Sequence, residues 1–189
     1  TEVALYGLAY SIGMLVQLFI SGMNSALTPW MYSKIKKGDI RSMRKVLQLL
    51  SIVVVGIAVA LMLISPELVL IFGSPKYREA VYVIPPVAAS VFFIFIYNIL
   101  SMPQFYYEKT QFLMVASMAA AGANVVLNFI FIRLFGYIAA GYTTLACYML
   151  YSVGHYIVSK RILVNEGIQE NLMNPGFLLA CSVFLIGAS

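Results

Sequence analysis

Long apolar runs separated by short charged links constrain the fold of this chain more than any other feature. Five runs reach the length of about 20 residues that a membrane-crossing helix needs: Val3 to Tyr32, Met43 to Ser65, Glu79 to Met102, Gln111 to Leu134 and Ala139 to Ser159. Backbone in hydrocarbon must satisfy its own hydrogen bonds, and a helix does so within one segment. Hydrophobic residues make up 62% of the chain and charged residues 10%, against about 45–50% and about 25% in soluble domains. The chain is therefore predicted to be an all-α, multi-pass membrane protein.

A sixth apolar run, Pro175 to Ser189, is shorter than a membrane crossing. We expect residues 1–173 to form a bundle of five spans, and residues 174–189 to begin a further transmembrane helix that is truncated. The chain opens without an initiator Met and without the segments of a signal peptide. We therefore expect it to be a fragment of a longer protein.

Proline, threonine and glycine set the expected ends of the spans. Pro66 is expected to stop the second span, and Pro85-Pro86 to break or kink the first turns of the third, because proline removes a helix hydrogen bond. Pro103 is expected to mark the end of the third span. Thr110 is expected to cap the fourth span, and Gly136 to close it.

Basic residues gather on one side of the predicted membrane. Nine lie in or beside the links after the first, third and fifth spans, and three on the other side. Lys and Arg accumulate in cytoplasmic loops, so the first span is predicted to run from outside to inside. This signal also accounts for the net charge of +5 without a nucleic-acid partner.

Enzyme and metal-site motifs do not occur in the sequence. It contains no GxxxxGK[ST], no HExxH, no zinc-spaced Cys/His set and no GxSxG. The acidic residues flank spans or lie in links, which argues against paired-carboxylate catalysis. Cys147 and Cys181 lie in apolar runs and are expected to act as small hydrophobic residues. The chain is predicted not to be an enzyme and to use no cofactor or metal.

A stripe of polar and small residues runs along the first span. Its members follow one another at steps of three or four residues, which places them on one helix face: Tyr6, Tyr10, Gly13, Gln17, Ser21, Asn24 and Thr28. Polar side chains in a membrane turn toward protein or a watery cavity. The stripe extends further than one helix crossing requires. Helix contact and cavity lining are equally supported interpretations of this face.

Three other spans carry shorter polar stripes. They comprise Ser90, Tyr97, Asn98, Ser101 and Gln104 on the third span, Ser117, Ala121, Asn124 and Asn128 on the fourth, and Thr144, Tyr148, Tyr151 or Ser152, His155 and Ser159 on the fifth. The second span has no polar side chain from Ile52 to Ile64. We expect it to face lipid broadly.

Four of the polar residues admit a structural and a functional interpretation. Asn124 and Asn128 lie one turn apart, and we favour bonds to a neighbouring helix, worth roughly 0.6–2 kcal/mol each, over ligand contact. For His155, the only histidine, a hydrogen bond to a neighbour is favoured over proton coupling. For Arg133, a side chain extended to the membrane interface is favoured over phosphate binding.

Several segments resemble bacterial polysaccharide flippases of the Wzx type, in the multidrug/oligosaccharidyl-lipid/polysaccharide exporter superfamily. The resemblance rests on the N-x-x-x-N step of Asn124 to Asn128, the run that ends in Phe135-Gly136, and the small-residue helix start that follows. Glu2 to Tyr10, Pro29 to Tyr32 with its basic link, and Tyr106 to Thr110 are also similar to segments of that family.

The resemblance implies a MATE-like exporter fold with two lobes of six helices around a central cavity. This chain would be most of the second lobe, with a first lobe elsewhere in the same protein. The implied function is to flip a polyprenyl-diphosphate-linked oligosaccharide across the bacterial inner membrane by alternating access, among membrane lipids. The alternatives are a cation-coupled multidrug exporter of the same fold and a membrane scaffold subunit. The candidate substrate-binding residues are Tyr6, Tyr10, Gln17, Ser21, Asn24, Thr28 and Asn98.

Overall fold

The computed structural model describes residues 2–72 and 75–189, with the side chains of residues 2–6, 8–10, 12, 15, 72 and 75–78 left outside the description. The described elements are all helical: α1 (Glu2–Lys36), α2 (Ile40–Leu63), α3 (Ser65–Phe72), the 3-10 helix η1 (Pro75–Tyr82), α4 (Ile84–Tyr106), α5 (Gln111–Phe135), α6 (Ala139–Asn165) and α7 (Pro175–Ala188). No strand occurs among these residues. The predicted all-α class is confirmed.

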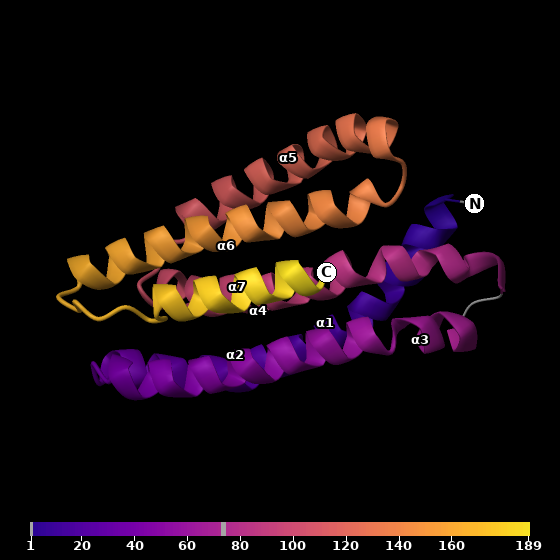
Figure 1. The fold of residues 1–189 in the computed structure, drawn as a ribbon. Helices are drawn as coiled ribbons and strands as arrows, with labels where there is room; N and C mark the ends of the chain where they lie inside the picture. The colour runs from indigo at the N-terminus through magenta and orange to yellow at the C-terminus, as the bar shows by residue number, and fades with distance from the viewer. Residues whose placement is uncertain (1, 73–74) are drawn as a thin grey trace.

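Three of the described helices, α2, α4 and α5, are long enough and apolar enough to cross a membrane, judged by length and composition alone. Helices α1 and α6, with 35 and 27 residues, also reach the length of a crossing. The long helices run along a common direction in Figure 1. These features agree with a multi-pass membrane protein, and the number of five spans stays a prediction.

Helix α4 is the centre of the bundle. It packs against α1, α2, α6 and α7, and its side chains from Pro86 to Ile96 are all buried. Phe92 and Phe95 are fully enclosed and join Met43 and Leu47 of α2 in one hydrophobic core. A helix that is hydrophobic over most of its surface is stable only when neighbours or lipid surround it. Here neighbouring helices cover most of its surface.

Helix α2 covers one side of α4 and is exposed on the other. Ser51, Val54 and Ala58 are buried, whereas Ile52 and Val53 are about half exposed. The expectation that this segment faces lipid broadly therefore holds for one face only. The sequence from Ile52 to Ile64 is apolar all round, so it does not distinguish the packed face from the exposed one.

The proline pair begins a helix instead of kinking one. The third span was expected to start at Glu79, but the chain from Pro75 to Tyr82 is a 3-10 helix, and α4 starts at Ile84 with Pro85-Pro86 in its first turn. Proline is tolerated there because the first N–H groups of a helix have no intrahelical partner. Pro103 lies inside α4, which continues to Tyr106, so the expected end at Met102 is wrong.

Other helix ends differ by a few residues from expectation. Helix α2 ends at Leu63, before Pro66, which lies in the first turn of α3. Thr110 stands at the N-cap position of α5, but its side chain makes no capping hydrogen bond, so that prediction is wrong. Gly136 closes α5 with a φ of 76°, a conformation that favours glycine. That prediction is confirmed.

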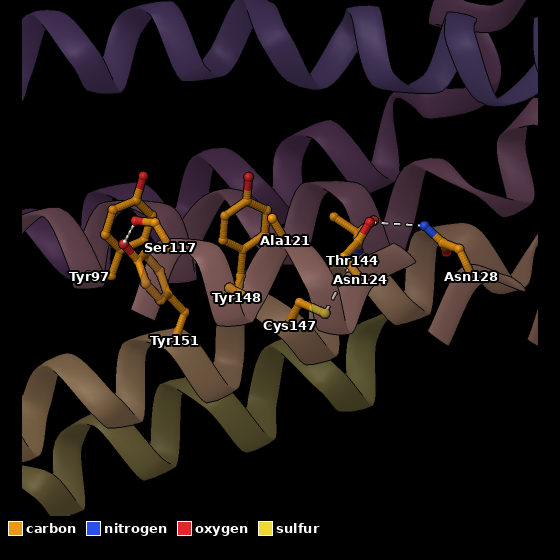
Figure 2. Close-up of a pocket in the computed structure, with 10 residues that line it drawn as sticks. Tyr97, Ser117, Ala121, Asn124, Asn128, Thr144, Cys147, Tyr148 and Tyr151 are labelled. Atoms are coloured by element: carbon orange, nitrogen blue, oxygen red, sulfur yellow. Dashed lines mark hydrogen bonds between the residues drawn. The ribbon is translucent and has the colours of Figure 1, made fainter. Parts of the chain in front are cut away.

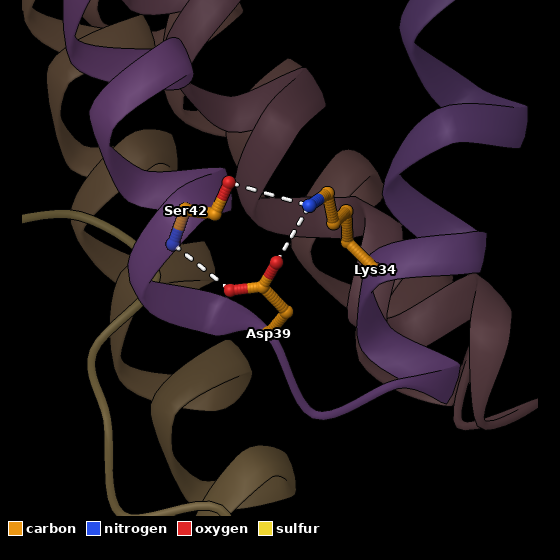
Figure 3. Close-up of polar contacts among 3 residues, drawn as sticks. All are labelled: Lys34, Asp39 and Ser42. Carbon is orange, nitrogen blue, oxygen red and sulfur yellow. Dashed lines mark hydrogen bonds and ion pairs between the residues drawn. The ribbon is translucent and has the colours of Figure 1, made fainter.

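The link between α1 and α2 is held by an ion pair and a cap (Figure 3). Lys34 Nζ lies 2.6 Å from Asp39 Oδ2, and the Ser42 backbone N–H donates to Asp39 Oδ1 over 3.3 Å. The hydrogen bond from Lys34 is the largest cause that lowers the pKa of Asp39 below its ordinary value of 3.8. Asp39 thus stays ionised and caps the first turn of α2.

The same end of the bundle carries two further ion pairs. Arg44 on α2 pairs with Glu170 over 3.3 Å and donates to the Asn171 carbonyl, and Lys109 pairs with Glu166 over 2.7 Å. The links between α1 and α2, α4 and α5, and α6 and α7 therefore meet at one end, on the left in Figure 1. Most of the basic residues lie in these links or in the helix turns beside them, as the orientation prediction requires.

Helix α7 packs against α2 and α4. Asn174 caps it, with its side-chain oxygen accepting from the Gly176 N–H over 2.9 Å. Leu185 is fully buried in the main core. The segment after residue 174 is thus a helix that docks on the bundle, and the division between residues 1–173 and 174–189 stays a prediction.

Candidate functional site

The stripe of α1 faces a polar hollow beside α4. Four of the predicted site residues on α1 line it, and Asn98 on α4 faces them. The hollow measures about 280 Å³, and its lining comprises Gln17, Ile20, Ser21, Asn24, Ser25, Thr28, Ile94, Tyr97 and Asn98. The structure thus brings Gln17, Ser21, Asn24, Thr28 and Asn98 together. We call this space the α1–α4 hollow.

Hydrogen bonds within the helices satisfy part of this lining. The Thr28 hydroxyl donates to the Asn24 carbonyl over 2.8 Å, and Asn98 Nδ2 donates to the Ile94 carbonyl over 2.8 Å. The side-chain oxygen of Asn24 is buried and has no hydrogen-bond partner among the described residues. A buried acceptor without a partner is costly, so a donor group that enters the hollow would gain a bond here.

Two predicted site residues, Tyr6 and Tyr10, have side chains that lie outside the described residues. Between them and the hollow, Gly13 is buried where a Cβ would lie 2.7 Å from Val87 Cγ1 on α4. This part of the stripe is a close helix contact. Both interpretations of the stripe therefore apply, with packing at Gly13 and a hollow from Gln17 to Thr28.

A second polar hollow lies among α4, α5 and α6 (Figure 2). It measures about 560 Å³ and is lined by Tyr97, Ser117, Ala120, Ala121, Asn124, Asn128, Thr144, Cys147, Tyr148 and Tyr151. The lining includes the whole stripe of the fourth predicted span and three of the five positions of the stripe of the fifth. We call this space the tyrosine hollow. Tyr97 lines both hollows.

Asn124 and Asn128 join α5 to α6. Asn128 Nδ2 donates to Asn124 Oδ1 over 2.9 Å, the Thr143 hydroxyl donates to Asn128 Oδ1, and Asn124 Nδ2 lies 3.7 Å from Cys147 Sγ. The predicted interhelical role of both asparagines is confirmed. Cys147, expected to be a small hydrophobic residue, also accepts a weak hydrogen bond.

His155 on α6 is enclosed against Gln104 of α4 and Phe112 of α5, outside both linings. Its Nδ1 lies 2.7 Å from Gln104 Nε2, and both side chains are fully buried. The predicted hydrogen bond to a neighbour is confirmed. Gln104 Oε1, His155 Nε2 and the Ser159 hydroxyl are buried without a partner among the described residues. Ser152 is also buried and donates to the Phe93 carbonyl over 3.0 Å. Of Tyr151 and Ser152, the two candidates for one position of the fifth-span stripe, Tyr151 is therefore the one that faces the tyrosine hollow.

Neither hollow has a charged lining. No Asp, Glu, Lys or Arg is among the residues that line them. Over the described part of the chain, no group of three His, Cys, Asp or Glu side chains is placed to hold a metal ion. Arg133, near the far end of α5, lies over the Phe129 ring at 3.8 Å from its centroid. The polar chemistry of both hollows is that of amides and hydroxyls.

Long apolar helices packed around uncharged polar hollows define the class first: this is a multi-pass membrane protein. The MatE family model matches residues 1–130, which is more than half of the chain. The chain therefore belongs to the MatE family of membrane exporters. Members of this family are transporters and not enzymes, in agreement with the prediction from the sequence motifs. No curated protein and no solved structure matches the chain.

The sequence also carried a signal for the tyrosine hollow. Ser117, Asn124 and Asn128 on α5, and Thr144, Tyr148 and Tyr151 on α6, follow the helical repeat within each span. The site prediction did not include them, because a repeat shows which residues share a face and not which faces meet. The pairing of α5 with α6 brings these two faces together.

Proposed function

We propose that this chain forms part of a transporter that moves a polyprenyl-diphosphate-linked oligosaccharide to the outer leaflet of a bacterial inner membrane, for surface polysaccharide assembly. The observation that carries the proposal is the α1–α4 hollow. Its lining offers amides and hydroxyls from Gln17, Ser21, Asn24, Thr28 and Asn98 and no charge. Sugars present hydroxyl groups that both donate and accept, and amide and hydroxyl side chains match them.

The surroundings of the hollow suit a substrate with a polar head and a long apolar tail. Leu18 and Phe19 follow Gln17 directly and are 68% and 55% exposed, so the stripe borders an apolar surface. The glycan would occupy the hollow while the prenyl tail stays in lipid. An apolar tail then never leaves hydrocarbon, which avoids the cost of exposing it to water.

The mechanism proposed is alternating access. Residues 1–173 would belong to the second of two helical lobes, residues 174–189 to a further helix, and a first lobe would close the cavity from the opposite side. Rocking of the two lobes would expose the polar hollow to one side of the membrane at a time.

A cation-coupled drug exporter of the same fold is the competing function. A cationic drug or coupling ion in a membrane is usually paired with a buried carboxylate. The linings of the α1–α4 hollow and the tyrosine hollow contain none. This difference supports an uncharged glycan as the group that this half of the protein handles.

The test is complementation with the full-length protein. Gln17→Ala, Asn24→Ala and the triple variant Gln17→Ala/Ser21→Ala/Asn24→Ala are introduced into cells that lack the transporter, and surface polysaccharide is measured. Each lost hydrogen bond of about 0.5–1.5 kcal/mol predicts a several-fold decrease for the single variants, and the triple variant should lose at least tenfold. Gln48→Ala on α2, outside both hollows, is the matched control for an amide and should behave as wild type.

Protein levels in the membrane are compared by immunoblot, so that a folding defect is separated from a transport defect. Unchanged polysaccharide in all three variants would contradict the role of the α1–α4 hollow. Drug-resistance assays on the same cells address the competing function. Lost drug resistance with intact polysaccharide would favour the drug exporter.

A further inference from the structure

The tyrosine hollow is built from elements other than the α1 stripe and has its own chemistry. Three of its lining residues are tyrosines, Tyr97 from α4 and Tyr148 and Tyr151 from α6. Its volume of about 560 Å³ falls in the range of about 300–1,000 Å³ typical of small-ligand sites. The hollow is therefore large enough to accept a ligand group of its own.

The aromatic rings form a fixed platform. The rings of Tyr97 and Tyr148 are parallel within 2°, with centroids 6.1 Å apart, and the Tyr151 ring meets the Tyr97 ring edge-on at 4.7 Å. Figure 2 shows the hydroxyls of Tyr97 and Tyr148 pointing to the same side. Behind them, Tyr151 packs on His155 at 4.4 Å, and Gln104 holds His155 in place. Neighbouring groups thus restrain these rings before any ligand arrives.

Hydroxyl and amide groups surround the platform. Ser117 and the Tyr151 hydroxyl share a hydrogen bond of 2.7 Å between α5 and α6, and either oxygen can be the donor. Asn124 and Asn128 extend the polar wall along α5. Flat aromatic faces beside hydrogen-bonding groups match a sugar ring, which presents C–H groups on its faces and hydroxyls around its edge.

The absence of charge narrows the ligand class. The lining holds no Asp, Glu, Lys, Arg or His. His155 packs on the side of Tyr151 that faces away from the hollow. Its side chain is fully buried, so it does not line the hollow. An anionic sugar or a diphosphate that entered would lose hydration without gaining a counter-charge, whereas the hydroxyl groups of a neutral sugar would exchange bonds to water for bonds to the lining.

We infer that the tyrosine hollow is a binding site for an uncharged sugar residue, which packs on the rings of Tyr97 and Tyr148 and bonds to the hydroxyl and amide groups of α5. This inference rests on the proposed function, since it names the part of the proposed substrate that these helices bind. The diphosphate is held by other residues than these.

The test measures binding to the full-length protein in lipid nanodiscs with three synthetic probes. Each probe is a short-chain prenyl diphosphate, and it carries a neutral trisaccharide, a trisaccharide with a uronic acid, or no sugar. The key variants are Tyr148→Leu, which removes the ring, and Tyr148→Phe, which keeps it. Tyr148 is chosen because it lines only this hollow, whereas Tyr97 lines both. Tyr156→Leu is the control, a half-buried tyrosine of the same helix outside both linings.

The expected result is specific to the neutral probe. Tyr148→Leu should weaken its affinity about tenfold, the loss of about one aromatic stacking contact, and Tyr148→Phe should retain affinity within about threefold. Neither variant should change binding of the sugar-free probe. Tyr156→Leu should leave all three affinities unchanged.

Each other outcome contradicts a different statement. If Tyr148→Leu weakens all probes equally, or none, the hollow is not a sugar site, although the proposed function stands as long as wild type binds the glycan probes. An equal loss for the neutral and the uronate probe overturns the preference for uncharged sugars. If wild-type protein binds none of the three, the proposed function fails, and this inference fails with it.

Discussion

Helices α4 and α5 are nearly equal in length, at 23 and 25 residues, and both are apolar enough to cross a membrane. Their surroundings are opposite. Most of α4 is buried among four neighbouring helices, whereas α5 packs mainly on α6 and has no buried residue among those described. Apolar composition thus identifies a membrane segment without showing whether other helices or lipid surround it.

The physical reason is that lipid tails and hydrophobic side chains offer similar environments to an apolar residue. Between helices in a membrane there is little hydrophobic driving force, and association depends on close packing and hydrogen bonds. Leu134 on α5 is 68% exposed and Leu100 on α4 is 1% exposed, although both residues are leucines on apolar helices. Matched substitutions on the two helices test this difference.

The largest contrast is expected for leucine truncation. Leu100→Ala on α4 should lower the free energy of unfolding by about 2–5 kcal/mol, because it leaves a cavity in a packed core. Leu134→Ala on α5 should change it by less than about 0.5 kcal/mol. Reversible unfolding of the full-length protein in mixed micelles measures both. Equal losses would show that α5 is as tightly packed in solution as α4.

Two glycines, one on α6 at its contact with α4 and one on α5, give the next largest expected effect. A Cβ at Gly141 on α6 would lie 2.8 Å from the ring atom Cγ of Pro86 on α4, whereas nothing lies within 4 Å at Gly122 on α5. Gly141→Ala should therefore cost about 1–3 kcal/mol. Gly122→Ala should be neutral, or stabilise by up to about 1 kcal/mol through helix propensity.

Thermal unfolding of the two glycine variants under identical conditions distinguishes them. The expected order of Tm is Gly122→Ala at or above wild type, and Gly141→Ala below it. A Gly141→Ala protein as stable as wild type would mean that the first turn of α4 moves away at no cost.

Hydrogen bonds at the two contacts of α6 differ in burial. Gln104→Met keeps the volume of the side chain but removes the bond to His155, leaving a buried ring without its partner, for an expected loss of about 1–3 kcal/mol. Ser117→Ala removes the bond to Tyr151 on the α5 side, where Ser117 is exposed, and should cost about 0.5 kcal/mol. The same unfolding measurement compares the two variants. A larger loss of stability for Ser117→Ala would contradict the expectation that the buried hydrogen bond contributes more than the exposed one.

The smallest effect is expected at the ion pair between Lys109, just before α5, and Glu166, just after α6. Both side chains are partly exposed, at 45% and 35%, so Lys109→Ala should cost less than about 1 kcal/mol. The loss should disappear at about 1 M salt, where charges are screened over a few ångströms. Lys160→Ala is the control, since Lys160 forms no ion pair with any residue that the structure describes. A loss that persists at high salt would indicate a packing role for the Lys109 side chain.

Periodicity within each helix was the most informative part of the sequence. It placed Gln17, Ser21, Asn24 and Thr28 on one face, and the structure finds these four side chains at one hollow. Their assignment to substrate stays a prediction. The partner faces were beyond the sequence, because facing helices are related by three-dimensional packing and not by spacing along one chain. Tyr148 was therefore recognised as part of a stripe but not as part of a site.

The prolines illustrate a second limit. Pro85-Pro86 was correctly recognised as an interruption, yet the same residues fit both a kink within a helix and the first turn of a new one. The structure has the second arrangement, with η1 ending at Tyr82 and α4 starting at Ile84. Local sequence gives the restriction on the backbone, and the choice between the two geometries comes from the packing of η1 and α4.

Tyr97 forms part of the wall of both hollows, so one side chain borders the α1–α4 hollow and the tyrosine hollow. Because the neighbouring rings of Tyr148 and Tyr151 restrain it, the Tyr97 ring offers a fixed surface to both spaces. Two parts of a single large ligand, one in each hollow, would then both contact the same side chain.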